Sequence, residues 1–286
     1  MAVSTVIIWM RMFMIFVMKL STFVKECWIY DEKSNIWIIY FRNMVTKGKC
    51  AYCLSSFSGN MMGKHLLLCR SRQDFIKEFE SKPPKDAKNS LKKYNEVTFY
   101  LLKIFSPGQP EYWLYIDLSD NLTLLDLDSF LRNTWLECCG HLSSFTIDDQ
   151  TYEYQLHKLF DNDSKSMRVK LKKLLYKGMS IGYIYDYGSS TEIEIKVISS
   201  HSDITENNSK FIKISARNDD IDFRCIKCKK EKATEICTIC LYEKEGGRTQ
   251  SSFCKSCAMK HECREEMTLP IINSPRSGVC GYTGEL

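Results

Sequence analysis

The central part of the chain alternates apolar and polar residues in the pattern of β-strands. The turn SPGQP separates two β-rich runs, VTFYLLKIF (97–105) and YWLYIDL (112–118), and this arrangement predicts an antiparallel pair. HLSSFTI and TYEYQL predict a shorter pair around the turn at 148–150. SIGYIYDY and TEIEIKVIS alternate around Gly188-Ser189-Ser190, which predicts a β-hairpin.

One segment, LTLLDLDSFLRNTWL, has helical periodicity instead. Its apolar residues recur every three or four positions, at Leu124, Leu127, Leu131 and Trp135. Thr123, with Asp126 three residues later, forms a capping box that would start this helix. Strands mixed with one principal helix, without repeated strand-helix-strand units, predict an α+β domain with a mainly antiparallel sheet.

Two polar stretches divide the chain into blocks. SKPPKDAKNSLKKYN (81–95) has two prolines, five lysines and little periodicity, so we expect a linker there. SSHSDITENNSK (199–210) is the second polar stretch and is expected to separate the central block from the last one.

The first 24 residues are strongly apolar but contain Arg11 and Lys19. These charges leave apolar pieces of about ten and seven residues, shorter than the roughly 20 that cross a bilayer. We expect a buried or poorly ordered extension, with Met14 or Met18 as alternative starts. A membrane anchor and a signal peptide are the alternatives, although no basic segment precedes the apolar run.

Composition and charge narrow the class of protein. A chain of 286 residues with 44% hydrophobic content can bury a real core, which indicates a globular protein. The net charge of +5 is uneven: residues 41–95 carry 12 Lys and Arg against 4 Asp and Glu (+8), and residues 96–200 carry 10 against 15 (−5). An anionic partner is therefore expected at the N-terminal part, and the centre is poorly suited to a phosphate backbone.

Most of the fourteen cysteines lie in Cys-x2-Cys pairs with histidine nearby. This spacing is typical of zinc sites rather than of a disulfide framework. Because thiolate ligands must stay reduced, we expect a cytoplasmic location.

The stretch KCAYCLSSFSGNMMGKHLLLC contains four candidate zinc ligands, Cys50, Cys53, His65 and Cys69. The Cys-x2-Cys turn presents two thiolates to one ion, and the last two ligands share one face of a helix. Phe57 and Met62 fall close to the core positions of a ββα finger, although the gap between the two ligand pairs is one residue shorter than usual. We expect a CCHC zinc finger.

The function of this finger is a separate question. Lys64, Arg70 and Arg72 lie on or after its helix and favour phosphate contacts over base reading. A single finger covers about three base pairs, so sequence-specific binding would need a partner, a dimer or a second module. The alternative is a zinc-stapled interaction surface with a solvated basic face.

A denser array of ligands follows near the C-terminus. Its members are Cys225, Cys228, Cys237, Cys240, Cys254, Cys257, His261, Cys263 and Cys280. The order resembles the cross-brace of B-box or RING-like modules, in which alternate pairs share an ion, and Cys280 could replace Cys263. With the finger this gives about three zinc ions. Closed four-ligand sites leave no position for an activated water, so the zinc would be structural, and cross-brace modules most often bind proteins.

The catalytic candidates of the central block are His141 and Asp186, but a turn-fixing histidine and a turn aspartate are the more common interpretations. Cys138 and Cys139 are adjacent, so we do not expect them to chelate an ion as a usual pair. Three alternating tyrosines are expected either to pack or to stack nucleic-acid bases: Tyr183, Tyr185 and Tyr187. The sequence has no phosphate loop, metallohydrolase motif or serine elbow, so we assign no catalytic residue.

TWLECCGHLSSF, with Trp135, His141 and Phe145, and the later YIYDYGSSTEIEIKV resemble the signature of the plasmid pRiA4b ORF-3-like family. The chain departs from that signature at Tyr187, where the family usually has Phe. ISARND, the cysteine array and LPIINSPRSGVCGYTG resemble a branch with zinc modules at both ends, so the resemblance covers roughly 48–286. It implies an association with plasmids and mobile elements; some members are labelled resolvases, but the resemblance implies no established activity.

Together these observations predict five segments. They are a hydrophobic extension (1–40), a CCHC finger (41–80), a linker (81–95), the ORF-3-like α+β domain (96–220) and a two-zinc cross-brace (221–286). We expect a non-enzymatic zinc protein that binds nucleic acid through 41–95 or a protein through the C-terminal module, with no small-molecule substrate and no membrane partner. The alternative is an enzyme with a site around His141 and Asp186.

Overall fold

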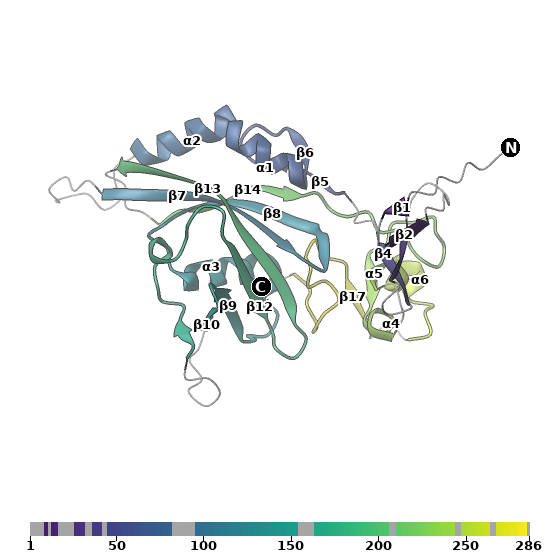
Figure 1. Ribbon diagram of the computed structural model, residues 1–286. Coiled ribbons are helices and arrows are strands. Elements are labelled where there is room, and N and C mark those ends of the chain that lie inside the picture. The colour runs from purple at the N-terminus through teal and green to yellow at the C-terminus, as the bar shows by residue number, and fades with distance from the viewer. Residues whose placement is uncertain are drawn as a thin grey trace. The chain divides into compact units, whose positions relative to one another are not determined.

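The structure is a computed structural model (Figure 1), and it describes residues 9–10, 13–16, 26–31, 36–41, 45–81, 95–153, 163–205, 210–243, 247–263 and 267–284. The chain divides into two compact units, Met1–Met44 and Val45–Leu286, and each is described by itself.

The first unit contains a four-stranded antiparallel sheet in the order β1-β2-β3-β4. Its strands are β1 (Trp9–Met10), β2 (Phe13–Phe16), β3 (Glu26–Asp31) and β4 (Ile36–Phe41). The short strands β1 and β2 lie in the apolar segment at 1–24, whose other residues lie outside the described ranges. Within the described ranges, no helix has the length and apolar character needed to cross a membrane.

A ten-stranded sheet forms the centre of the second unit, in the order β11-β10-β9-β12-β13-β7-β8-β14-β5-β6. All neighbouring strands are antiparallel except β10 and β11. The strands are β5 (Lys47–Cys50), β6 (Ser56–Ser58), β7 (Asn95–Ser106), β8 (Gln109–Ser119), β9 (Ser143–Ile147), β10 (Gln150–Glu153), β11 (Lys165–Ser166), β12 (Ser180–Tyr185), β13 (Thr191–Thr205) and β14 (Ile212–Asn218). The predicted α+β class and mainly antiparallel sheet are confirmed.

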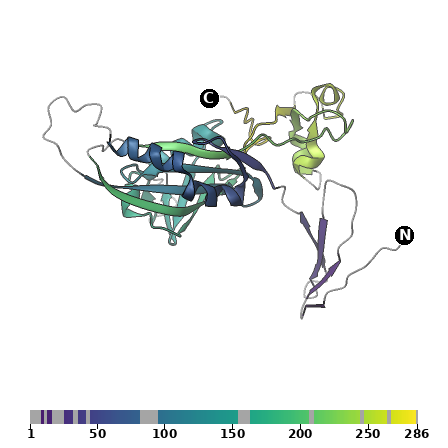
Figure 2. The same cartoon turned by 90° about the horizontal axis from the view of Figure 1, so that it is seen from above.

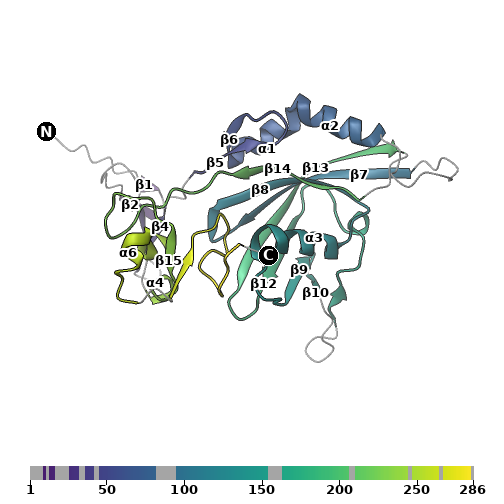
Figure 3. The same ribbon diagram turned by 180° about the vertical axis from the view of Figure 1, so that it is seen from behind.

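Helices cover this sheet on both faces. The first two, α1 (Gly59–Leu68) and α2 (Arg70–Ser81), lie across one face (Figures 1 and 2). The third, α3 (Leu124–Leu131), continues into a wider turn, η1 (Arg132–Leu136), and packs on the opposite face (Figure 3). A short 3-10 helix, η2 (Leu171–Lys173), precedes β12.

The two faces explain why β7 and β8 are nearly continuous apolar runs. Successive side chains of a strand point to opposite faces. Leu102 and Leu114 face the α3 side and belong to the main core, whereas Leu101 and Trp113 face α1 in a second cluster. Because both faces are covered, both sets of side chains must be apolar.

The predicted helix start is present in α3. The Asp126 backbone N–H donates to the Thr123 hydroxyl at 3.2 Å, and the Thr123 N–H donates to the Asp126 carboxylate at 2.7 Å. The four apolar positions predicted for its buried stripe, Leu124, Leu127, Leu131 and Trp135, are all fully buried.

Two expectations about boundaries are changed. The second polar stretch does not form a linker over 199–205, because β13 runs to Thr205 and stays paired with β7, with Ser202 opposite Thr98. The polar side chains at 201–203 are exposed. They do not prevent strand pairing, because the hydrogen bonds between strands are made by backbone groups. Of the first linker, 81–95, residues 82–94 lie outside the described ranges, whereas Ser81 ends α2 and Asn95 begins β7.

The C-terminal part has a three-stranded sheet in the order β16-β15-β17 and three short helices. They are β15 (Glu235–Cys237), α4 (Thr238–Glu243), α5 (Arg248–Ser251), β16 (Ser252–Phe253), α6 (Lys255–Ala258) and β17 (Thr268–Pro270). The segment after β17 returns to the central domain, where the Ser274 hydroxyl donates to the carbonyl of Trp135 in η1 at 2.6 Å.

Candidate metal centres

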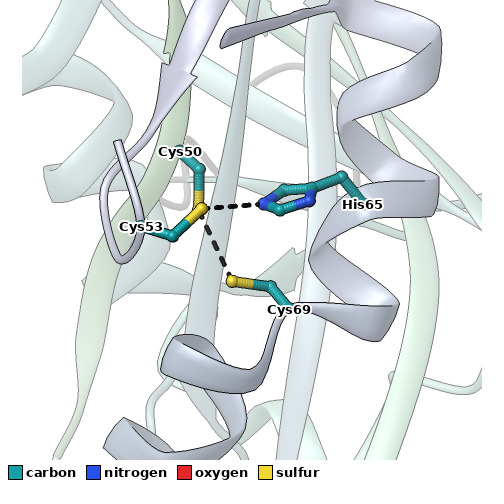
Figure 4. A group of neighbouring side chains, drawn as sticks. All are labelled: Cys50, Cys53, His65 and Cys69. Carbon is teal, nitrogen blue, oxygen red and sulfur yellow. Dashed lines mark hydrogen bonds between the residues drawn. The ribbon is translucent and has the colours of Figure 1, made fainter. Parts of the chain in front are cut away.

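The four predicted finger ligands come together beside the central sheet (Figure 4). Cys50 ends β5, Cys53 lies in the following turn, His65 lies on α1 and Cys69 follows α1. The Sγ atoms of Cys50 and Cys69 are 3.9 Å apart, and Cys53 Sγ lies 3.2 Å from His65 Nε2. All four ligand atoms lie within 4.8 Å of one another.

These distances fit a metal ion better than a disulfide. An ion held tetrahedrally at about 2.3 Å from each sulfur places two sulfurs about 3.8 Å apart. A disulfide would require about 2.05 Å. The residues therefore fit a zinc site, although zinc binding itself stays a prediction.

Packing holds the imidazole of this cluster in place. The Phe57 ring stacks on His65 with their centroids 4.3 Å apart and an angle of 24° between planes. Met62 is fully buried between α1 and the sheet. Of the two positions expected to form the core of the finger, Phe57 thus contacts the imidazole and Met62 belongs to the buried cluster.

The surroundings of two finger cysteines shift their pKa values in opposite directions. Hydrogen bonds from Ser55 lower the pKa of Cys53 to about 6, whereas burial raises the pKa of Cys69 to about 11. The surroundings therefore favour the thiolate of Cys53 and the thiol of Cys69, so zinc binding would require Cys69 to release its proton to solvent.

The finger is built into the central sheet. Its strands β5 and β6 continue the edge after β14, with Cys50 opposite Ala216 and Gly48 opposite Asn218. A Cβ on Gly48 would overlap the Arg217 carbonyl oxygen, so the close approach of β5 requires glycine there. The segment expected over 41–80 as a separate module therefore shares one sheet with the α+β domain.

The three predicted phosphate-contacting residues have different surroundings. Lys64 and Arg70 are exposed, but Arg72 is buried. The Arg72 guanidinium donates to both oxygens of Asp117, which is fully buried, and also to the Leu66 carbonyl. The expectation that Arg72 contacts phosphate is therefore wrong, because its charge is used inside the protein.

The C-terminal array forms two clusters. One contains Cys225, Cys228, Cys254 and Cys257, and the other contains Cys237, Cys240, His261 and Cys263. The Sγ atoms of Cys228 and Cys254 are 3.9 Å apart. Cys240 Sγ lies 3.8 Å from Cys263 Sγ and 3.1 Å from His261 Nε2. These are the alternate pairs that the cross-brace interpretation combines, and Cys263, not Cys280, completes the second group.

Sequence reasoning missed a further cluster. Cys280 lies beside Cys138, Cys139 and His141 of the central domain. The two adjacent cysteines were not expected to chelate an ion as a usual pair, and that expectation stays untested, but the chain after η1 leaves both sulfurs near one another and the Cys139 sulfur near the imidazole. The signal available in the sequence is a surplus of cysteines: Cys280, Cys138 and Cys139 belong to no Cys-x2-Cys pair.

His141 and Asp186, the candidate catalytic residues, interact with other protein groups. Asp186 is buried in a left-handed turn conformation (φ 66°), where its carboxylate accepts the Gly188 N–H at 3.0 Å and pairs with Arg276 at 2.7 Å. Burial raises the pKa of Asp186, but these hydrogen bonds outweigh burial and hold it below its usual value. A cavity of about 320 Å³ near Tyr112 and Phe223 is lined by neither His141 nor Asp186.

The tyrosine stripe mostly serves packing. Tyr183 is buried and its hydroxyl donates to Asp128 at 2.8 Å, and Tyr185 is buried and donates to Glu137 at 3.1 Å. Tyr187 is 51% exposed. The first two are therefore not available to stack nucleic-acid bases.

Fold and clusters define an α+β protein whose Cys/His groups can hold metal ions. Residues 100–219 match the family model described as plasmid pRiA4b ORF-3-like protein, so this part of the chain is a domain of that family. The match contains neither the finger ligands nor the two C-terminal clusters, so the branch with zinc modules at both ends stays a prediction.

A solved structure that matches the chain is a protein of unknown function, MM3350 from Methanosarcina mazei Go1. It is 17% identical, the match covers 41% of this chain and 68% of that one, and the TM-score is 0.33. No curated protein matches the chain.

Proposed function

We propose that this protein is a non-enzymatic binding module whose zinc ions are structural. The observation that carries this proposal is the composition of the clusters. Each brings four protein ligands within 4.8 Å of one another, and such a set fills the tetrahedral shell of zinc. An ion bound in this way has no position left for a water or a substrate, so its contribution is to fold and rigidity.

The enzyme alternative around His141 and Asp186 has less support. The imidazole lies among thiols, and both carboxylate oxygens of Asp186 accept hydrogen bonds from the protein. A general base needs a free acceptor within reach of a substrate.

We further propose that the finger surface contacts the phosphate backbone of nucleic acid without reading its sequence. Lys47, Lys49, Lys64 and Arg70 are exposed on the finger and the start of α2. Lysine and arginine at exposed positions contribute affinity that depends on salt rather than on base identity.

Salt-dependent binding tests this partner. Full-length protein, purified with zinc under reducing conditions, should bind a labelled generic duplex or RNA in fluorescence anisotropy, and the affinity should fall between about 50 and 200 mM salt. Combining Lys64→Ala with Arg70→Ala should make the slope of log affinity against log salt shallower, by about one for each phosphate that is no longer neutralised.

The matched control combines Lys172→Ala with Lys177→Ala, which removes the same charge from exposed positions of the central domain. If the finger variant and the control variant lose the same nucleic-acid affinity, or if the natural protein does not bind even at the lowest salt, the nucleic-acid proposal is overturned. The zinc content of each protein must be unchanged for the comparison to hold.

A protein partner is the second candidate, and the outward side of α1 favours it. Met61, Leu67 and Leu68 are 50%, 40% and 80% exposed next to Lys64. Exposed apolar side chains of this kind are used more often by protein interfaces than by phosphate contacts. The natural protein should retain a protein partner in a pull-down from native cells. The variant that combines Met61→Ser with Leu68→Ser should lose that partner but keep the salt-dependent nucleic-acid binding. The two-zinc C-terminal module is a further proposed protein-binding surface.

A further inference from the structure

We propose that Cys138, Cys139, His141 and Cys280 form a fourth zinc site, which fastens the C-terminal segment to the central domain. This site is separate from the three sites that the sequence predicts. Three of its ligands lie at 138–141 and the fourth lies at 280, and no sequence motif links these two segments.

The distances are those of a ligand shell. Cys139 Sγ lies 3.7 Å from Cys138 Sγ and 3.8 Å from Cys280 Sγ. His141 Nε2 lies 2.9 Å from Cys139 Sγ and 3.1 Å from Cys280 Sγ. The two distances between sulfurs match the separations of 3.8 and 3.9 Å between sulfurs in the other three clusters. Three thiols and one imidazole are a ligand set that selects zinc.

The imidazole is oriented as a metal ligand would be. Nε2 of His141 faces the sulfurs, and Nδ1 faces the Asp186 carboxylate at 3.5 Å. A ligating histidine commonly has a carboxylate on its second nitrogen, which fixes the ring and its tautomer. Asp186 is fixed in turn by Arg276, so the two candidate catalytic residues are explained as a ligand and its support.

The same C-terminal segment supplies Arg276 and Cys280. The Arg276 side chain is fully buried, and besides Asp186 it donates to the Ser189 carbonyl and the Thr191 hydroxyl at 3.0 Å each. Arg276 Nη2 also lies 3.5 Å from Cys138 Sγ. The segment therefore reaches the central domain through direct contacts at 274–276, and the ion would hold it at 280.

The backbone at Cys280 has a conformation that is uncommon for a residue other than glycine. Cys280 has φ 50°, and the neighbouring Gly278 and Gly281 have φ 84° and 68°. A non-glycine residue in this region is strained and persists where its surroundings demand that conformation. The left-handed turn aims the side chain at 280 toward His141, 3.1 Å from its Nε2.

Exposure distinguishes this site from the finger. Cys139 and Cys280 are exposed, whereas Cys50 and Cys69 of the finger are buried. A chelator reaches exposed ligands first, so the fourth ion should leave before the finger ion does. The attachment at Cys280 would then be reversible, while the direct contacts at 274–276 and the finger stay intact.

Zinc counting in the full-length protein tests the proposal. Mass spectrometry of the reduced, folded protein should give about four zinc ions, and Cys139→Ser and Cys280→Ser should each lower the count by one. Thr283→Ser is the control, because Thr283 is exposed in the same segment and is not a ligand. In limited proteolysis, Cys280→Ser should release the C-terminal segment faster than Thr283→Ser.

The outcomes separate this inference from the proposed function. Three zinc ions in the natural chain, unchanged by Cys139→Ser and by Cys280→Ser, would refute the fourth site and leave the other three standing. A folded, reduced protein without zinc would refute both. Two serine variants at two exposed positions keep the test valid if one of them fails to fold.

Discussion

Arg72 illustrates how surroundings decide the role of a residue. In the sequence it is one of several basic residues around a finger helix and is indistinguishable from Arg70 two positions earlier. In the structure its guanidinium is buried against Asp117, which also accepts from Tyr52 at 2.8 Å and Ser215 at 2.6 Å. The arginine therefore joins α2 to β8 through a buried polar network.

Removing this arginine should destabilise the fold strongly. Arg72→Ala leaves the Asp117 carboxylate buried without its counter-charge, and we expect the free energy of unfolding to fall by about 3–5 kcal/mol. Urea denaturation of the natural protein and of the variant measures this decrease in the free energy of unfolding. Arg70→Ala, at an exposed position, should change stability by less than about 0.5 kcal/mol. Equal effects of the two substitutions would show that the buried pair is not a major contributor.

At the scale of elements, strand β5 decides whether the finger joins the sheet. It pairs with β14 on one side and with β6 on the other, and it ends at the ligand Cys50. Trp113 packs on the same side, where its indole N–H donates to the Thr46 hydroxyl at 2.8 Å. A small displacement of β5 would therefore disturb the ligand, the tryptophan and the sheet edge together.

Gly48→Ala tests this dependence. The added methyl would meet the Arg217 carbonyl and the Trp113 ring, so β5 must move, and we expect stability to fall by about 1–3 kcal/mol. Chemical denaturation followed by tryptophan fluorescence reports the change. Gly108→Ala is the control, because a Cβ there would meet nothing within 4 Å. If Gly48→Ala is as stable as the control, the close approach of β5 is not required.

At the scale of the whole second unit, the parts differ in what stabilises them. The central domain has an extended apolar core that includes Leu102, Ile116 and Trp135. The buried cluster of the C-terminal part consists mainly of cysteines that are themselves ligands, with Phe253 and Ala258. Because such a small core gives little stability by itself, we expect the C-terminal part to need bound metal in order to fold.

Removing zinc should therefore unfold the two parts at different stages. With a strong chelator, limited proteolysis should cut within 221–263 before it cuts within 96–200, and added zinc should restore protection. Far-UV circular dichroism should retain most of the β-sheet signal at that stage. Simultaneous cleavage of both regions would mean that the central domain also needs metal in order to fold.

The sequence predicts those structural features that are determined by residues close together in the chain. The capping box of α3, its buried stripe and the hairpin of β12 and β13 follow from patterns a few residues long. The finger ligands and the cross-brace pairs are recognisable because their spacing is itself the signal. The pairing of Arg72 with Asp117 and of His141 with Cys280 joins residues 45 and 139 positions apart, and no local pattern indicates which distant side chains meet.

The place of the finger at the end of the large sheet has a consequence for solubility. Strands β5 and β6 cover the hydrogen-bonding edge of β14, which would otherwise offer free backbone N–H and carbonyl groups to any extended chain. If the finger lost its ion and detached, that edge would become a template for pairing between copies. Metal supply would then determine how much of the protein stays dispersed and how much aggregates, whatever the protein binds.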